Sequence, residues 1–267
     1  MRTACLALCA LLLAACSTTP RRAAMPERST PPPPPASLDA IPDAVPRVEA
    51  RSEHGNPVSY DVFGKRYFIL PSAEGYKERG VASWYGPDFH SKATSSGEPY
   101  DMYAMTAAHK TLPIPCYARV TNLANGRSVV VRINDRGPFV DNRIIDLSYT
   151  AAYKLDMTRA GTAFVEVETI TPGEPGEIAR ELAPQPLPAL IAPRLFLQAG
   201  AFGVAANATQ MAARLRDAGM SNVAILPPDA GATLYRVRVG PIGDVAAYDA
   251  LAAQLDKLGI ATLLVTE

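Results

Sequence analysis

The sequence lacks most of the features that identify a common class of functional site. Its 267 residues carry 26 basic and 26 acidic side chains, so the formal net charge is zero and no basic tract indicates nucleic-acid binding. There are only three histidines, His54, His90 and His109, and no pair of them has a metal-ligand spacing. It has no phosphate-binding loop and no GxSxG motif. We therefore expect no metal and no cofactor.

Cysteine is also scarce, and three of the four residues lie within the first 16 positions. The apolar residues 6–15 are fewer than the ~20 that a membrane helix needs, and with Arg2 before them they predict a secretory signal peptide (1–15). LAAC at 13–16 resembles a bacterial lipobox, whose cysteine, here Cys16, would carry lipid; the alternative is ordinary cleavage beside an incidental cysteine. Because Ser17 is not the aspartate of inner-membrane retention, the resemblance implies anchoring to the outer membrane, facing the periplasm. Cys116 then has no intrachain partner and fits a small buried residue better than a nucleophile.

Two stretches of the chain have little capacity to form a core. Residues 16–57 are rich in proline, alanine, arginine and serine, with five prolines at 31–35, and predict an extended, disordered tether. Residues 171–193 have a similar composition and predict a second linker. Residues 58–170 and 194–267 remain as two ordered domains, each long enough for a small core.

The first domain is predicted to be mainly β. Its short apolar or alternating runs are GVASWYG, PCYARVTNL, RSVVVRIN and TAFVEVETI, and Asn125-Gly126 predicts a hairpin between two of them. SYTAAYKLDM (148–157) predicts one helix with Ser148 as its N-cap, and MTAAHK (105–110) predicts a short helical turn. Many short strands with few helices indicate a small barrel or sandwich.

The second domain contains a duplicated βαβ unit of about 35 residues. Its predicted strands are RLFLQAGAF, NVAIL, YRVRVGPIG and ATLLV. Two helical patterns separate them, the first ended by Gly219 and the second begun by Asp244 and ended by Gly259. Two helices on one face of a four-stranded sheet would leave the other face open for binding. The residues placed on that face as binding contacts are Gln198, Phe202, Tyr235 and Arg238.

Three polar residues of the first domain lie at turns or strand ends, from which side chains project into grooves. Each has an ordinary explanation: Glu98 as a solvated loop acid, His109 as a strand-edge cap, and Asp135 as an ion-pair partner. A surface pair of Asp135 with Arg132 or Arg136 would be worth only ~0–1 kcal/mol. Together, two carboxylates and an imidazole suit acid–base cleavage of a glycosidic bond.

Asp135 is the predicted acid–base residue, with Glu98 assisting or positioning. Along its strand Val131 and Ile133 share one face, and Asp135 would share it too, so it is expected to point toward the mouth of the barrel. A guanidinium beside Asp135 would favour its charged form and make it a poor proton donor. We therefore expect Arg132 and Arg136 to be structural or to position substrate.

Aromatic side chains just before Glu98 suit stacking on sugar rings. Trp84 fits the barrel core as well as it fits a sugar platform. Tyr85 and Phe89 are the predicted aromatic glycan contacts of the groove, and Asn134 and Arg136 are the predicted polar ones.

The same segments resemble the rare lipoprotein A family of septal lytic transglycosylases through nearly all of residues 79–168. The matching segments are GVASWYG, FHSKATSSGEPYDMYAMTAAHKTLP, ARVTNLANGRSVVVRINDRGPF and NRIIDLS. Residues 194–267 resemble a sporulation-related repeat (SPOR) domain, which binds peptidoglycan glycan that lacks stem peptides. The resemblance implies a mainly β plus α+β chain: a six-stranded double-psi β-barrel followed by a small βαββαβ domain.

The resemblance also implies an activity. Such enzymes cleave the β-1,4 bond between N-acetylmuramic acid and N-acetylglucosamine without water, leave 1,6-anhydro ends, and act at the septum in cell separation. The conserved acids of the family fall on Glu98 and Asp135, and its histidine falls on His109. The chain departs from the family at Ser91 and Cys116, away from these three positions. A non-catalytic, expansin-like glycan binder and a hydrolase using the same acids remain open alternatives.

Overall fold

A computed structural model describes residues 35, 37–172, 194–229 and 231–267. The predicted signal peptide, Cys16 and most of the predicted linker at 171–193 lie outside these residues. None of the helices in the described part of the chain has both the length and the apolarity needed to cross a bilayer.

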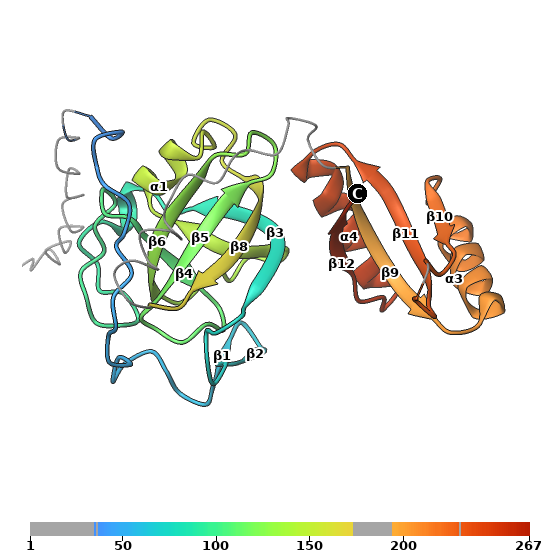
Figure 1. Ribbon diagram of the computed structural model, residues 1–267, viewed down its shortest axis with the longest axis horizontal. Helices are drawn as coiled ribbons and strands as arrows, with labels where there is room; N and C mark the ends of the chain where they lie inside the picture. Colours follow the sequence, from blue (N-terminus) through green and yellow to red (C-terminus); the bar gives the residue numbers. More distant parts are fainter. Residues whose placement is uncertain (1–34, 36, 173–193, 230) are drawn as a thin grey trace, which may run out of the picture. The chain divides into compact units, whose positions relative to one another are not determined.

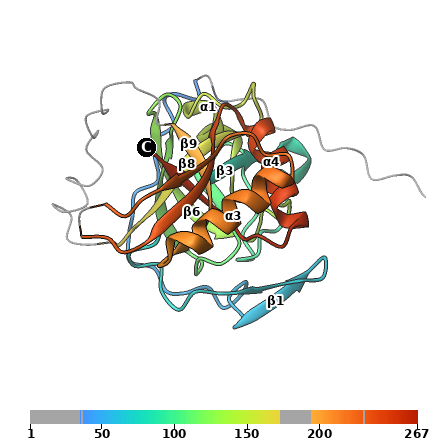
Figure 2. The same ribbon diagram turned by 90° about the vertical axis from the view of Figure 1, so that its right-hand side faces the viewer.

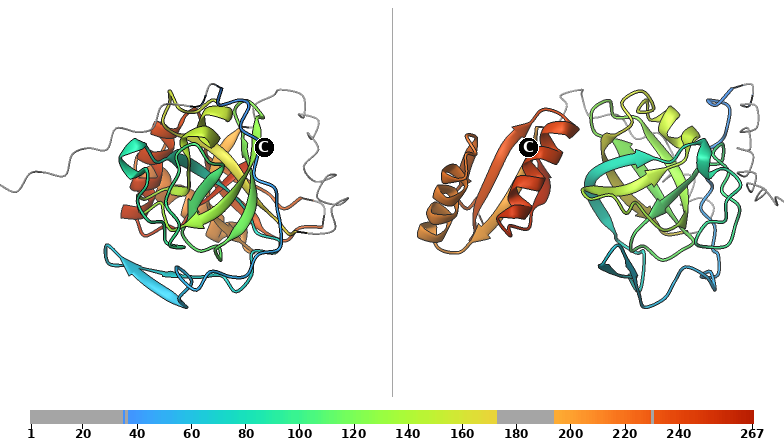
Figure 3. Two further views of the ribbon diagram at one scale, coloured as in Figure 1. Left: turned by 90° about the vertical axis from the view of Figure 1, so that its left-hand side faces the viewer. Right: turned by 180° about the vertical axis from the view of Figure 1, so that it is seen from behind.

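Six strands close into a barrel in the order β3-β7-β4-β6-β5-β8 (Figures 1 and 3). They are β3 (Lys77–Trp84), β4 (Thr106–His109), β5 (Cys116–Asn122), β6 (Ser128–Asp135), β7 (Arg143–Leu147) and β8 (Ala163–Ile170). The β3–β7 and β4–β6 pairs are parallel, and the other four pairs are antiparallel. Alternate side chains fill the interior: Ala82, Ala107, Ala118, Val120, Val129, Val131, Ile133, Ile145, Leu147, Val165 and Val167. Full burial of each valine, leucine or isoleucine side chain stabilises the fold by about 1.5–3 kcal/mol.

The helix predicted at 148–157, which lies between β7 and β8, is confirmed, whereas the helical turn predicted at 105–110 is wrong. Helix α1 (Tyr149–Lys154) begins after Ser148, whose Oγ accepts a hydrogen bond from Ala151 N at 3.3 Å. Residues 106–109 instead form β4, which is bonded to β6 on one side and β7 on the other. Two flanking partners outweigh the weak local helical preference of this short alanine-rich run. Asn125-Gly126 does turn the chain between β5 and β6, with Gly126 at φ 72°.

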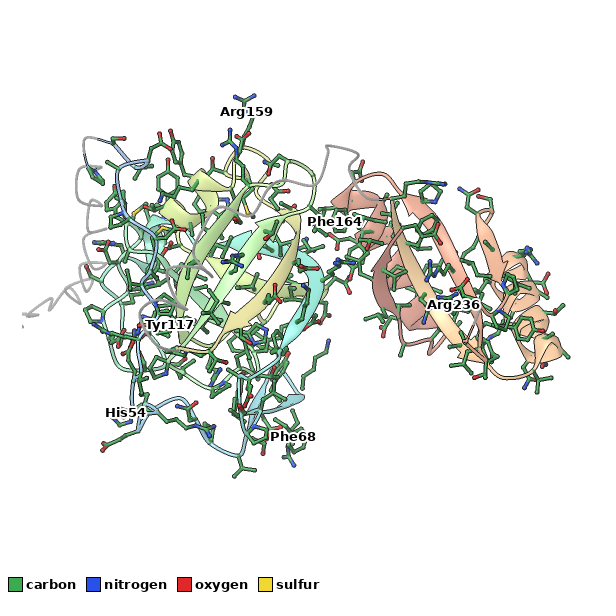
Figure 4. The ribbon with its side chains drawn as sticks, in the orientation of Figure 1. His54, Phe68, Tyr117, Arg159, Phe164 and Arg236 are labelled. Atoms are coloured by element: carbon green, nitrogen blue, oxygen red, sulfur yellow. The ribbon has the colours of Figure 1, made fainter. Side chains whose placement is uncertain are left out.

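Residues 41–57 lie along one side of the barrel, which differs from the tether predicted to extend to residue 57 (Figure 1). The early part of β6 pairs with β5 on one side, but β4 reaches only as far as Arg132 on the other. The segment supplies hydrogen bonds on that second side: Ala44 N donates to Val130 O, and Val130 N to Asp43 Oδ2 at 2.8 Å. Asn56 bonds both backbone groups of Ile114, at 2.6 and 2.9 Å. The chain then forms a hairpin of β1 (Ser59–Val62) and β2 (Lys65–Phe68). In Figure 4, His54 and Phe68 mark this part of the chain.

The C-terminal domain has the predicted duplicated pattern. The sheet order is β10-β11-β9-β12, all antiparallel, and helices α3 and α4 pack on one side of it (Figure 2). Its elements are β9 (Leu195–Phe202), α3 (Ala205–Asp217), β10 (Val223–Leu226), β11 (Tyr235–Ile242), α4 (Val245–Lys257) and β12 (Leu263–Thr266). Asp244 caps α4 by accepting from Ala247 N at 2.7 Å, and Gly219 and Gly259 follow the helices at φ 89° and 66°.

Candidate active site

A β-bulge at the end of β6 determines where Asp135 lies. Ala107 pairs with Ile133, but the next residue of β4, Ala108, pairs with Asp135, so Asn134 is an extra residue on β6. The bulge breaks the alternation that would have put Asp135 on the face of Ile133. Asp135 instead lies beside Ala108, outside the apolar interior, which corrects the face expected from the sequence.

The carboxylate of Asp135 is fixed by a tight turn over residues 94–98. Its Oδ1 accepts three hydrogen bonds of 2.7 Å, from Ser95 N, Ser95 Oγ and Arg136 N. The turn is closed by Thr94 N donating to Glu98 O at 2.8 Å and Gly97 N to Thr94 O at 2.9 Å. Among the residues that the structure describes, none donates to Oδ2 of Asp135, and the residue is partly exposed, so this oxygen is not committed to another group of the described chain.

Glu98 ends the same turn, and it is held by a guanidinium. Arg132 donates to both of its carboxylate oxygens, at 2.7 and 3.0 Å, and Asn134 Nδ2 donates to Oε2 at 2.8 Å. These bonds, the Arg132 bond first, lower the pKa of Glu98, although 43% of the side chain is exposed. Glu98 is therefore an anion at neutral pH, and the turn brings it and Asp135 to one site.

Arg132 also binds a second carboxylate that the sequence did not single out. Glu49, in the segment read as tether, accepts from Arg132 Nε and Nη2, both at 2.9 Å. Tyr117, labelled in Figure 4, donates its hydroxyl to the same carboxylate. Mainly because of Arg132, the pKa of Glu49 falls to about 2. No local signal identifies this partner, because it lies 83 residues from Arg132 in a proline-rich region.

The guanidinium of Arg136 turns away from the carboxylate of Asp135. It donates to the carbonyl oxygens of Gly55, His109 and Leu112, at 2.8, 3.0 and 2.5 Å, and to Asn56 Oδ1 at 3.1 Å. These bonds occupy the donors that the sequence had assigned to glycan. The geometry thus favours the structural role for Arg136, and neither arginine neutralises Asp135.

His109 is buried, with 2% exposure, and does not face a groove as expected. Its Nδ1 accepts from Thr111 N and Leu112 N, at 3.2 and 3.0 Å, so Nε2 carries the hydrogen in the hydrogen bond to the Tyr76 hydroxyl at 2.9 Å. Burial, and then the charges of Arg136 and Lys110, lowers the pKa of His109 to about 3. The ring is neutral at physiological pH, and this geometry favours a role in shaping the chain after β4.

The predicted aromatic contacts divide between the core and the surface. Trp84 packs against the barrel core and against the Tyr149 ring, with 5.5 Å between centroids. Tyr85 stacks on Tyr100 at 4.0 Å, and within the described chain its buried hydroxyl has no hydrogen-bond partner. Phe89 is 52% exposed. Phe89 is therefore the most accessible of the three rings.

The structure also gives the positions of Asn134 and of the predicted binding residues on the C-terminal sheet. Asn134 is buried and orients Glu98. In the sheet, Gln198 pairs with Arg238 and Phe202 with Tyr235 on the central strands. Arg238 is buried, however, and its guanidinium binds Glu267 at 2.5 Å, so it is not free on an open face.

Metal and thiol chemistry find no support in the described residues. They contain no cluster of three or more histidine, cysteine, aspartate or glutamate side chains able to hold a metal ion. Cys116 begins β5 as a partly buried residue, and burial raises the pKa of its thiol to about 12. The site therefore consists of carboxylates, hydroxyls and one guanidinium.

Comparison with known proteins identifies both domains. A family model described as lytic transglycolase matches residues 77–167, and the SPOR domain model matches residues 192–266. An endolytic peptidoglycan transglycosylase RlpA of Pseudomonas aeruginosa is 40% identical over 279 aligned residues, covering 84% of this chain and 79% of that protein. The chain belongs to the RlpA family. The barrel is thus a double-psi β-barrel, and the C-terminal domain is a SPOR domain.

Other RlpA proteins match this chain at higher identity but over less of their length. The RlpA of Vibrio cholerae is 58% identical over 139 residues, which are 52% of this chain and 52% of that protein. The RlpA of a Neisseria meningitidis serogroup A strain is 55% identical over 137 residues, covering 51% and 57% of the two chains. The chain thus spans about half the length of these relatives.

Proposed function

We propose that this chain is an endolytic peptidoglycan lytic transglycosylase. Its substrate would be glycan strands without stem peptides, cut between N-acetylmuramic acid and N-acetylglucosamine with formation of 1,6-anhydro ends. The observation that carries the proposal is a pair of carboxylates at one turn, over residues 94–98: Asp135, bonded to the turn with Oδ1 fixed and Oδ2 unshared, and Glu98, in the turn and held as an anion. Membership of the RlpA family supports the same chemistry.

The reaction needs two proton transfers and the exclusion of water. The C6 hydroxyl of the muramic residue attacks its own anomeric carbon and loses a proton, while the departing glycosidic oxygen gains one. Asp135 is the proposed proton-transfer residue, because its Oδ2 is unshared whereas Oδ1 is held by three donors. A positioned acid–base group contributes about 10²–10⁴-fold. Holding the hydroxyl near the anomeric carbon adds an intramolecular advantage worth effective molarities of roughly 10⁵–10⁸ M.

Glu98 has a different role in this proposal. Its two bonds to Arg132 keep it ionised, so it is a poor proton donor. An anion at this position stabilises the positive charge that develops at the anomeric carbon in an oxocarbenium-like transition state. Glu98→Gln would then lower the rate while leaving the proton-transfer residue in place.

The SPOR domain would deliver the barrel to peptide-free glycan, with Gln198, Phe202 and Tyr235 as the proposed contacts. Lipid on Cys16 would anchor the mature chain to the outer membrane, so that the barrel acts in the periplasm at the division septum. Residues 1–34, which include Cys16, lie outside the described part of the chain.

Digestion of purified glycan tests the proposal. Sacculi stripped of stem peptides are incubated with the purified chain, and the products are separated and weighed by mass spectrometry. New 1,6-anhydro ends are the expected result, and Asp135→Asn removes them. New reducing ends would instead indicate a hydrolase, and binding without any new ends would indicate a non-catalytic glycan binder.

A further inference from the structure

A second aspartate lies in the same cross-strand row as Asp135. Ala108 of β4 pairs with Asp135 on one side and with Asp146 of β7 on the other, and Asp146 pairs in turn with Ser83 of β3. We call Asp135, Ala108, Asp146 and Ser83 the aspartate row. Side chains opposite one another in a sheet project to the same face, and a methyl group between two carboxylates leaves room above it. Two carboxyl groups thus flank one small residue.

The turn after Asp135 stays close to this row without filling it. A methyl group built on Gly137 would be 3.8 Å from both the Ala108 Cβ and Asp146 Oδ2, which is ordinary van der Waals contact. The Gly137 backbone, at φ 140°, therefore passes beside Asp146 at a position where a larger residue is disfavoured. Asp146 remains partly accessible and belongs to the same surface as Asp135.

The surroundings of Asp146 differ from those of Glu98. No guanidinium or ammonium group is hydrogen-bonded to it within the described chain; its bond is from the Ser83 hydroxyl to Oδ1. Burial raises the pKa of Asp146, and the negative charge of Asp135 acts in the same direction. The Ser83 bond and the more distant charges of Lys110 and Arg143 oppose this shift.

The remaining polar neighbours do not neutralise Asp146 either. Lys110, at the end of β4, directs its ammonium group to the Arg143 carbonyl at 2.6 Å. The hydroxyl groups of Tyr85 and Tyr100 have raised pKa values, chiefly through burial and also through the charges of both aspartates. They therefore stay protonated near neutral pH, and the two aspartates are the carboxyl groups of this row.

We propose that Asp146 is the general acid of the site and that Asp135 is its base, a division of labour that rests on the proposed function. Carboxyl groups whose environments differ in this way take opposite roles in acid–base catalysis, because the desolvated one keeps its proton and the solvated, hydrogen-bonded one does not. With this assignment Asp135 carries out one of the two proton transfers of the reaction, and Asp146 carries out the other.

The step balances without water. The Asp146 carboxyl gives its proton to the glycosidic oxygen as the bond from that oxygen to C1 breaks, and the bonding pair stays on the departing oxygen. The C6 hydroxyl oxygen forms the new bond to C1, and its proton goes to Oδ2 of Asp135. One proton then passes from Asp135 back to Asp146 to restore the starting state, and no other reactant is consumed.

Leaving-group chemistry tests the acid role in the full chain. Asp146→Asn keeps an oxygen that accepts the Ser83 bond but supplies no acidic proton. On peptide-free glycan we expect its turnover to fall by about 10²–10⁴-fold. On a short muramic-terminated glycan carrying a 2,4-dinitrophenyl leaving group, which departs without protonation, turnover should stay within about tenfold of the unmutated chain. Asp135→Asn should be impaired on both substrates.

Each other outcome overturns the assignment. Full activity of Asp146→Asn on glycan, or equal losses on both substrates, would mean that Asp146 is not a proton donor. Absence of anhydro ends with the unmutated chain would overturn the proposed function itself, which separates the two failures.

Ser83→Ala provides a second measurement if Asp146→Asn does not fold. Removing the hydroxyl bond favours the protonated Asp146, so the alkaline decline of activity should move to higher pH. An unmoved decline in a folded Ser83→Ala chain would contradict the acid role.

Discussion

The barrel holds carboxylates in two regions by different physical means. On what we call the arginine side, Glu49 and Glu98 share the guanidinium of Arg132 and are fixed as anions. In the aspartate row, the bonds to Asp135 and Asp146 come from backbone amides and hydroxyl groups. Pairing with a cation stabilises the charged form of a carboxyl group, whereas desolvation, the main influence on Asp146, stabilises its protonated form.

Because of this difference, we expect the acids of the arginine side to contribute mainly to the stability of the fold and those of the aspartate row to take part in proton transfer. An acid committed to a guanidinium contributes to the fold over a wide pH range but cannot exchange a proton near neutrality. An acid that is bonded to amides and hydroxyls, and not to a cation, can take part in proton transfer during the reaction. The two regions meet at the turn over residues 94–98, where Ser95 binds Asp135 and Glu98 binds Arg132.

Replacing Asp135 is the largest expected effect and tests whether the aspartate row does the chemistry. Asp135→Asn should lower the rate of anhydro-end formation by about 10²–10⁴-fold, because the amide cannot take the C6 hydroxyl proton. The formation of anhydro ends on peptide-free glycan is followed by mass spectrometry. Asp141→Asn is the matched control, since that carboxylate is 72% exposed and forms an ion pair with Lys65 on the surface. Equal losses in the two variants would contradict the role of the row.

The buried histidine beneath the site should give stability a steep dependence on pH. The pKa of His109 is about 3 in the folded chain, against 6.5 for a histidine exposed to water, so its neutral form contributes stability above pH 6.5 that is lost as pH falls toward 3. From pH 7 to pH 5 this loss is about 2 kcal/mol in the free energy of unfolding. Urea unfolding at several pH values should show it in the unmutated chain and in His54→Asn, an exposed control, but not in His109→Asn. A slope retained in His109→Asn would show that another group is responsible.

The arginine side should matter chiefly for stability. Arg132→Met leaves two carboxylates facing each other without their cation, and we expect it to lower the free energy of unfolding by about 2 kcal/mol, after allowance for the exposure of Glu98. Arg66→Met is the control, because Arg66 also binds both oxygens of its partner, Asp61, but the two side chains are 62% and 56% exposed. That variant should change stability by ~0–1 kcal/mol. Similar losses in both variants would show that burial does not distinguish the two pairs.

Much of the fold follows from local patterns, but the strands that build the site do not. Strands β5, β6 and β8 and the two helices of the SPOR domain were predicted because alternation and caps are local signals. Strand β4 was read as a helical turn, and β7 was not predicted from its pattern, because both owe their form to neighbours on each side. These two strands carry Ala108 and Asp146, so the aspartate row has no signature in the sequence.

The site was predicted only in part for similar reasons. The turn over residues 94–98 contains Glu98 and binds Asp135 through Ser95, and neither Arg132 nor Arg136 binds the Asp135 carboxylate through its guanidinium. The burial of His109 was not foreseen, because a residue at a strand end can face either way. The bulge at Asn134 depends on the register with β4, which no single strand reveals.

The smallest expected effect tests the comparison most directly, because the two regions should respond to pH with opposite signs. The pKa of Glu49 is lowered from 4.5 to about 2, so its contribution is present above pH 4.5 and is lost as pH falls, by about 0.7 kcal/mol between pH 5 and pH 4. The pKa of Asp146 is raised above 3.8, so its contribution is present below that pH and is lost as pH rises. We would measure the free energy of unfolding in urea at several pH values. Glu49→Gln should reduce the loss of this free energy as pH falls below 5. Asp146→Asn should reduce the loss of this free energy as pH rises above 4. If both substitutions reduced the same loss, charge pairing and desolvation would not be the forces that separate the two regions.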